Sequence, residues 1–124
     1  MIAVDTSSMI AYLGGERGRD VEAVDAGLDA RQAVLPPVVL TELLSDPRLE
    51  RSMVDLFREI PVLPVSDGYW ERTGALRSKL LARGLRARLA DALIAQSCID
   101  HRVALVTRDA DFRHFARLGG LKLI

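Results

Sequence analysis

Short apolar runs that alternate with helical patterns constrain the fold of this chain more than any other feature. Runs long enough only for a short strand are expected at residues 2–4, 33–35, 62–65, 103–106 and 121–123. Helices are expected at residues 6–13, 18–30, 38–45, 49–59, 66–83, 89–101 and 109–118. This alternation predicts an α/β fold, a three-layer sandwich in which a mainly parallel central sheet of about five short strands carries helices on both faces.

Length and composition describe one globular domain that spans residues 1–124. With one cysteine, Cys98, and two histidines, the chain forms neither an internal disulfide nor a Cys/His zinc cluster. The N-terminus reaches a carboxylate, Asp5, too early for a signal peptide, and no uncharged run approaches the roughly 20 residues of a membrane helix. The formal net charge of zero argues against binding nucleic acid through bulk charge alone. We therefore expect a cytoplasmic protein that has no membrane segment.

Carboxylates follow the ends of the predicted strands. Asp5 comes directly after the first strand, and Asp109 follows the fourth strand after a two-residue connection. Glu42 lies early in the helix that follows the second strand. Because the carboxyl ends of parallel strands meet at one edge of a sheet, and ligands bind beyond that edge, the topology alone predicts that these three carboxylates converge.

Asp91 has an unusual position on its predicted helix. At 100° per residue it shares a face with Ile94 and Cys98, whereas Gln96 and Asp100 point the other way. A carboxylate is therefore expected on a stripe that faces the core. Burial of an unpaired ionised carboxylate costs several kcal/mol, so proteins neutralise it, pair it or bind it to a metal ion.

Each of these acids also has an ordinary structural interpretation. Asp5 and Asp109 are placed to cap the helices that follow them. Glu42 is free to pair with an arginine, and Asp91 to form a salt bridge with Arg88 or to act as a cap near the helix start. The residues alone leave these alternatives open for each acid, but the joint pattern favours a functional site.

Four stretches together resemble the successive motifs of PIN-domain ribonucleases, the toxins of VapBC-type toxin–antitoxin systems, in the same order and at similar intervals. The resemblance covers essentially the whole chain, and the last two motifs are the most specific. The stretches are Asp5-Thr6-Ser7, Thr41-Glu42-Leu43-Leu44, Leu89-Ala90-Asp91-Ala92-Leu93-Ile94-Ala95 and Leu105-Val106-Thr107-Arg108-Asp109-Ala110-Asp111-Phe112.

The resemblance implies a PIN-like fold and a Mg²⁺-dependent endoribonuclease that acts as the toxin of a type II toxin–antitoxin system, with Mn²⁺ as a substitute ion. The implied catalytic acids are Asp5, Glu42, Asp91 and Asp109. Asp5, Asp91 and Asp109 are the implied metal ligands, the last directly or through water. Glu42 is then a ligand of a second ion or the group that orients the attacking water. Asp111 is accessory in this scheme, or else a solvated residue of a first helical turn.

The resemblance also implies an RNA substrate, a cognate antitoxin protein and a homodimer. The apolar helices at residues 21–28 and 49–57 are candidates for the antitoxin contact, although a core helix has the same pattern. Tyr69 and Trp70 are expected in the core or at a dimer contact, and His101 and His114 at the surface or partly buried. A run of six basic residues without an acid is expected to line the site as a positive rim or to form a solvated helix face: Arg72, Arg77, Lys79, Arg83, Arg86 and Arg88.

Two other classes of protein are alternatives to the nuclease. An aspartyl phosphatase requires Asp-x-Asp at the first strand, where this chain has Asp5-Thr6-Ser7, and a phosphotransfer receiver requires paired acids there. A catalytically silent PIN-fold binding module is the remaining alternative, and absent metal binding would identify it.

Hydroxyl side chains lie next to the candidate acids in the sequence. Thr6, Ser7 and Thr107 are expected to donate hydrogen bonds to the carboxylates or to act as caps.

Overall fold

A three-stranded parallel sheet lies at the centre of the molecule. The computed structural model describes residues 1–124. The strands β1 (Ile2–Val4), β2 (Ala33–Val34) and β3 (Ala104–Val106) pair in the order β2-β1-β3. Ile2 lies opposite Ala33 on one side and Ala104 on the other. β1, the first strand in sequence, is therefore the central one, and the predicted α/β fold with a parallel sheet is confirmed.

The prediction of about five strands was wrong in its count. The two expected outer strands are reduced to single parallel bridges, Leu35 with Val62 and Leu105 with Leu123. Proline explains the first case, because Pro61 and Pro64 have no N–H with which to extend a ladder. Two hydrogen bonds of 2.9 Å remain at this bridge. The Leu35 amide donates to the Pro61 carbonyl, and the Leu63 amide donates to the Leu35 carbonyl.

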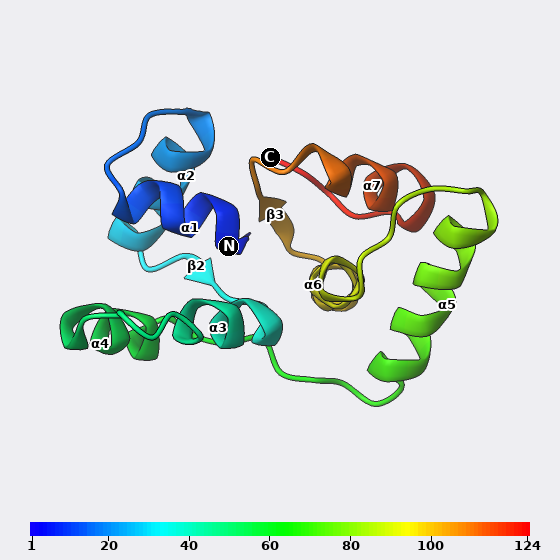
Figure 1. Cartoon of the computed structure of the whole chain (residues 1–124), viewed down its shortest axis with the longest axis horizontal. Helices are drawn as coiled ribbons and strands as arrows, with labels where there is room; N and C mark the ends of the chain where they lie inside the picture. Colours follow the sequence, from blue (N-terminus) through cyan, green and yellow to red (C-terminus); the bar gives the residue numbers. More distant parts are fainter.

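Seven α-helices and one 3₁₀ helix surround the sheet (Figure 1). The pair α1 and α2 covers one face, and α3 and α6 lie on the other, where α5 forms the outermost layer behind α6. None of the helices combines the length and the apolar composition needed to cross a bilayer. The bounds are α1 (Thr6–Leu13), α2 (Arg19–Asp29), α3 (Pro37–Leu44), α4 (Arg51–Glu59), α5 (Tyr69–Ala82), α6 (Leu89–His101), η1 (Ala110–Phe112) and α7 (Arg113–Gly119).

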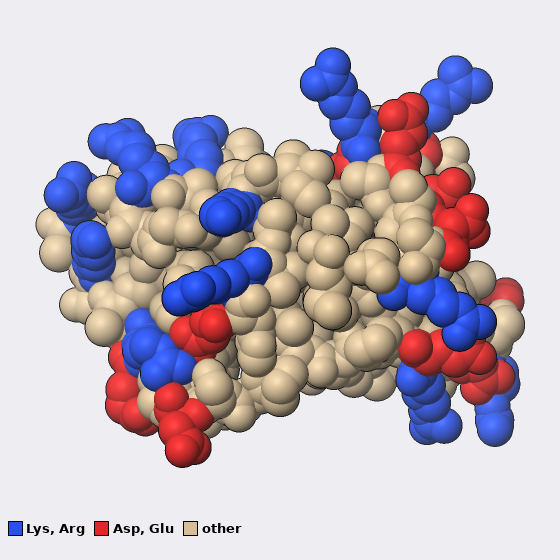
Figure 2. All heavy atoms as spheres, turned by 180° about the vertical axis from the view of Figure 1, so that it is seen from behind, with Lys and Arg blue, Asp and Glu red and all other residues tan.

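Charged side chains gather toward the two ends of the long axis. Seen from behind, the middle of the molecule is largely free of Lys, Arg, Asp and Glu (Figure 2). Lys and Arg side chains cluster at the upper left of that view, on the side that holds α5 and α7. At the right-hand end of the same view, Lys and Arg side chains lie among Asp and Glu side chains (Figure 2).

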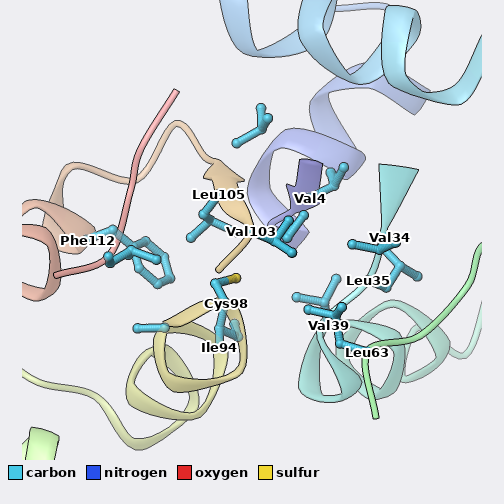
Figure 3. Packing of buried hydrophobic residues seen from close by; sticks show 14 of the residues in the cluster. Val4, Val34, Leu35, Val39, Leu63, Ile94, Cys98, Val103, Leu105 and Phe112 are labelled. Carbon is cyan, nitrogen blue, oxygen red and sulfur yellow. The ribbon is translucent and has the colours of Figure 1, made fainter. Parts of the chain in front are cut away.

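The helix α6 lies between the sheet and α5 and is covered on both sides. Ile94 and Cys98 are buried toward β3, as Figure 3 shows. Gln96 and Asp100 do point away from the sheet, but Gln96 is buried as well. The expectation that this side of the helix faces away from the core was wrong, because the 14-residue α5 packs against it.

The stretch predicted as one helix over residues 109–118 is divided. A single 3₁₀ turn, η1, comes first, and α7 begins at Arg113. The Asp109 carboxylate accepts a hydrogen bond from the Asp111 amide at 2.9 Å, which fixes the tight turn. The turn buries Phe112, which packs against Phe115.

Two neighbouring leucines of α5 give a matched test of this packing. Leu80 is 0% exposed in the core and Leu81 is 47% exposed. We expect Leu80→Ala to lower the free energy of unfolding by about 2–5 kcal/mol, because it leaves a cavity between α5 and its neighbours. Leu81→Ala should change it by no more than about 0.5 kcal/mol. Urea unfolding of both variants measures the difference, and equal losses would contradict the packing described.

Candidate metal centre

Asp5 is the most deeply buried acid at the carboxyl edge of the sheet. Its residue is 4% exposed, and its amide donates to the Val106 carbonyl at 2.9 Å, which aligns the ends of β1 and β3. The carboxylate oxygen Oδ2 accepts hydrogen bonds from Ser7 Oγ and Thr107 Oγ1, both at 2.7 Å. The side chain does not cap α1. The capping interpretation was therefore wrong for Asp5, and the expected hydroxyl donors are confirmed.

The second oxygen of Asp5 has a different environment. No hydrogen bond reaches Oδ1, and no buried polar side-chain atom of the molecule lacks a partner. Oδ1 therefore carries no hydrogen bond and is not completely covered, although the residue is only 4% exposed. One oxygen of the carboxylate is fixed by two hydroxyl groups, and the other has no hydrogen-bond partner.

Asp109 and Asp111 follow β3 on the same edge. The Asp109 amide donates to Thr107 Oγ1 at 3.0 Å, so one hydroxyl links this residue to Asp5. The Asp109 carboxylate caps η1, which confirms the capping interpretation for this acid. Asp111 lies 3.8 Å from Arg86 in a partly exposed ion pair.

Glu42 reaches the site from the last turn of α3, so the expectation that it lies early in this helix was wrong. Its Oε1 accepts a hydrogen bond from Thr6 Oγ1 at 2.7 Å, and the residue itself is exposed. No arginine pairs with it, so that interpretation of Glu42 was wrong. Thr6 is the first residue of α1 and directly follows Asp5 in the chain. Its hydrogen bond therefore ties Glu42 to the residue next to Asp5.

Asp91, in the first turn of α6, lies within the electrostatic influence of the other acids of the site. Burial, followed by the negative charges of Asp109, Asp5 and Glu42, raises the pKa of its carboxyl from 3.8 to about 6. Arg88 opposes the shift but forms no ion pair with Asp91. Four acids from separate segments thus share one electrostatic environment.

This set of donors fits a hard divalent cation. All of the candidate ligands are oxygens, which Mg²⁺ and Mn²⁺ prefer, and a cation would relieve the repulsion that raises the pKa of Asp91. No group of three or more His, Cys, Asp or Glu side chains stands close enough to hold one ion directly. An ion at this edge would therefore take one or two carboxylates and keep several waters, as Mg²⁺ commonly does.

Arg108 and Asp20 belong to the surroundings of the site and were missed by the sequence analysis. The Arg108 guanidinium binds Asp20 through Nε at 2.8 Å and Nη2 at 3.1 Å. This ion pair holds the pKa of Asp20 down at about 2. The one available signal was the position of Arg108 directly before Asp109, and it gives no indication of a partner 88 residues away.

The basic run is only partly available as a rim. Arg72 binds Asp100 with two hydrogen bonds of 2.9 and 2.7 Å. Arg77 donates to the Ala87 carbonyl and Lys79 to the Leu118 carbonyl, both at 2.8 Å. These three side chains connect helices and loops. The remaining arginines of the run are exposed: Arg83, Arg86 and Arg88. Of these, Arg86 and Arg88 lie beside acids of the site.

The remaining aromatic and histidine side chains have structural contacts. His101 is partly buried with Nε2 2.7 Å from the Pro64 carbonyl oxygen, and His114 is partly buried, as expected. Tyr69 lies in the core and donates to the Leu93 carbonyl at 2.6 Å. Trp70 is exposed and so does not lie in the core, and the alternative of a dimer contact stays a prediction.

Comparison with known proteins identifies the family. The sequence profile of the PIN domain matches residues 2–118, and the chain belongs to the PIN domain family. Its fold is similar to VapBC2 from Rickettsia felis bound to a promoter DNA fragment, with a TM-score of 0.78, 23% identity and coverage of 100% of this chain and 98% of that one. The fold is also similar to FitAcB from Neisseria gonorrhoeae, with a TM-score of 0.71, 21% identity and coverage of 100% of this chain and 96% of that one. For VapBC-1 from nontypeable Haemophilus influenzae the TM-score is 0.72 and the identity 20%, with coverage of 100% of this chain and 97% of that one. No curated protein sequence matches significantly.

The raised pKa of Asp91 predicts a specific pH dependence. Between about pH 4 and pH 6 the folded state holds a proton that the unfolded state has lost, so its contribution to stability is present at low pH and is lost as the pH rises through 6. Without divalent cations we expect Asp91→Asn to melt at a higher temperature than wild type at pH 7. The difference should vanish below pH 4, and melting curves in EDTA measure it. A lower melting temperature for the variant at pH 7 would contradict the assignment.

Proposed function

We propose that this protein is a Mg²⁺-dependent endoribonuclease that acts as the toxin of a type II toxin–antitoxin system, with Mn²⁺ as a substitute ion. The observation that carries the proposal is the convergence of Asp5, Glu42, Asp91 and Asp109, where burial and then the neighbouring negative charges raise the pKa of Asp91. Membership of the PIN family supports the choice of reaction. The proposed setting is the cytoplasm.

The proposed reaction is hydrolysis of RNA phosphodiester bonds. Asp5 and Asp91 would hold the ion, with Asp109 as a ligand directly or through water. When bound, the ion supplies an acidified water and neutralises charge on the phosphate. Ser7 and Thr107 hold one Asp5 oxygen and leave the other free.

Glu42 has a different role from the other three acids. It is exposed, and Thr6 fixes one of its oxygens at 2.7 Å. A fixed carboxylate at the edge of the site is suited to accept a hydrogen bond from the attacking water or to hold a second ion. Asp111 is accessory, because it pairs with Arg86.

Exposed arginines beside the acids support an RNA substrate. Arg83, Arg86 and Arg88 lie on the segment that leads from α5 to Asp91, and Arg86 already reaches Asp111. Arginine binds phosphate oxygens in a bidentate manner, and such contacts position a nucleic acid backbone without reading its sequence. We therefore assign these three side chains to the RNA backbone.

The proposed protein partner is a cognate antitoxin. The similar structures include toxin–antitoxin complexes from several bacteria. In this chain a groove of about 320 Å³ runs between α1, α3 and α4 and borders Glu42. Its apolar lining includes Ile10, Leu49 and Met53, so the second of the two helices predicted for this contact contributes to it. The proposed assembly also contains a second copy of the toxin.

Metal-dependent cleavage tests the proposed function. We expect purified wild type to cut a pool of structured RNAs with Mg²⁺ or Mn²⁺ and not with EDTA. Asp5→Asn and Asp91→Asn should each reduce cleavage by more than about 100-fold, because several kcal/mol of charge stabilisation depend on the ion. Asn keeps the shape of Asp and can still accept hydrogen bonds, so both variants should fold.

A surface acid provides the control. The Asp55 side chain on α4 is 60% exposed, and its one ion pair, with Arg51, is long at 3.9 Å. Asp55→Asn should therefore cut RNA as wild type does. No cleavage with any ion, combined with no Mn²⁺ binding by wild type, would reject the nuclease and favour the catalytically silent binding module.

A further inference from the structure

The side chain of Arg108 binds the connection between α1 and α2 and the first turn of α2, and its partners do not include the four acids of the site. All three of its nitrogens are used: Nε and Nη2 bind Asp20, Nη1 binds Glu16 at 3.0 Å, and Nη2 also donates to the Arg17 carbonyl at 3.3 Å. The Asp20 side chain is 13% exposed. A charged pair with this many bonds differs from a simple surface ion pair, which contributes little.

The same carboxylate of Asp20 is also bound by α1, at the oxygen that accepts from Arg108 Nε. Ser8 Oγ, fully buried, donates to Asp20 Oδ2 at 2.8 Å. The neighbouring Ser7 donates to Asp5 in the same way, and Thr107 donates to Asp5 as Arg108 does to Asp20. Two consecutive residues after β3 are therefore joined to two consecutive serines of α1, each through one carboxylate.

Gly18 shows that the backbone is fitted closely around this pair. Its φ is +151°, a conformation that favours glycine, and a Cβ there would lie 2.6 Å from Asp20 Oδ1 and 3.3 Å from Arg108 Nη2. A side chain at this position would displace the ion pair. The turn before α2 thus accommodates Arg108 and Asp20 together.

We propose that Arg108 and Asp20 are positioning residues for the acidic site and hold Thr107 and Asp109 in register with Asp5. This inference rests on the proposed function, since the cation is what the acids are positioned to bind. Neither residue is assigned to the ion or to RNA. The chain connects them to the acids directly, because Arg108 lies between Thr107 and Asp109 and its amide is 3.4 Å from Ser7 Oγ.

Cation affinity distinguishes positioning from a simple effect of charge. Loss of a positive charge beside acids should by itself tighten cation binding, and loss of a negative charge should weaken it. Positioning predicts that Arg108→Gln and Asp20→Asn both weaken binding, by similar factors. A purely structural ion pair would lower the melting temperature and leave the affinity of the folded protein unchanged.

The experiment is calorimetric titration of the full chain with Mn²⁺ for wild type, both single variants, the double variant and Arg108→Lys. We expect each single variant to raise the Kd for Mn²⁺ about tenfold, the lower end of the range for residues that orient metal ligands. The double variant should bind no more weakly than either single one, because both changes remove the same pair. Arg108→Lys should recover part of the loss.

A second ion pair of the same kind serves as the control. Arg72 binds Asp100 with two hydrogen bonds near the far end of α6, nine residues from Asp91. Arg72→Gln should lower the melting temperature and leave the Kd for Mn²⁺ at the wild-type value. An unchanged or tighter Kd for Arg108→Gln would overturn the positioning role. Failure of wild type itself to bind Mn²⁺ would instead overturn the proposed function and this inference with it.

Discussion

The burial of the Asp5 carboxylate at the end of the central strand is the constraint around which the site is organised. An ionised carboxylate that is 4% exposed is stable only with partners, and here Ser7 and Thr107 both donate to the same oxygen. These bonds connect the start of α1 with the loop after β3. Because the Asp5 amide also bonds to Val106, side chain and backbone together fix the two strand ends against each other.

The remaining acids are brought to this point by packing and not by mutual attraction. Asp91 is held there because α6 lies between the sheet and α5, and Glu42 because α3 packs against α6. Their repulsion appears in the raised pKa of Asp91. The apolar core therefore stabilises an arrangement that the charges oppose, and a bound cation would reduce their repulsion. Arrangements that shift pKa values in this way are typical of functional sites.

The sequence predicted the central strands and the edge at which the acids meet, because apolar runs and parallel topology determine both. It overcounted strands, since it did not show that Pro61 and Pro64 would limit the Leu35 contact to a single bridge. It placed the far side of α6 away from the core, because helical periodicity does not reveal α5 packed behind it. The pairing of Arg108 with Asp20 was also missed, since a contact between side chains so distant in sequence depends on the finished fold.

A crystal structure grown with Mn²⁺ and recorded at the manganese absorption edge tests the central claim most directly. The account predicts an anomalous peak at the carboxyl edge of the sheet, bonded to the free oxygen of Asp5 at roughly 2.0–2.2 Å and surrounded by waters that reach Asp91 and Asp109. The account would be contradicted if the four acids kept their positions and no anomalous peak appeared beside them, at a Mn²⁺ concentration that supports binding in related all-oxygen sites. An ion bound only elsewhere on the surface would also contradict it.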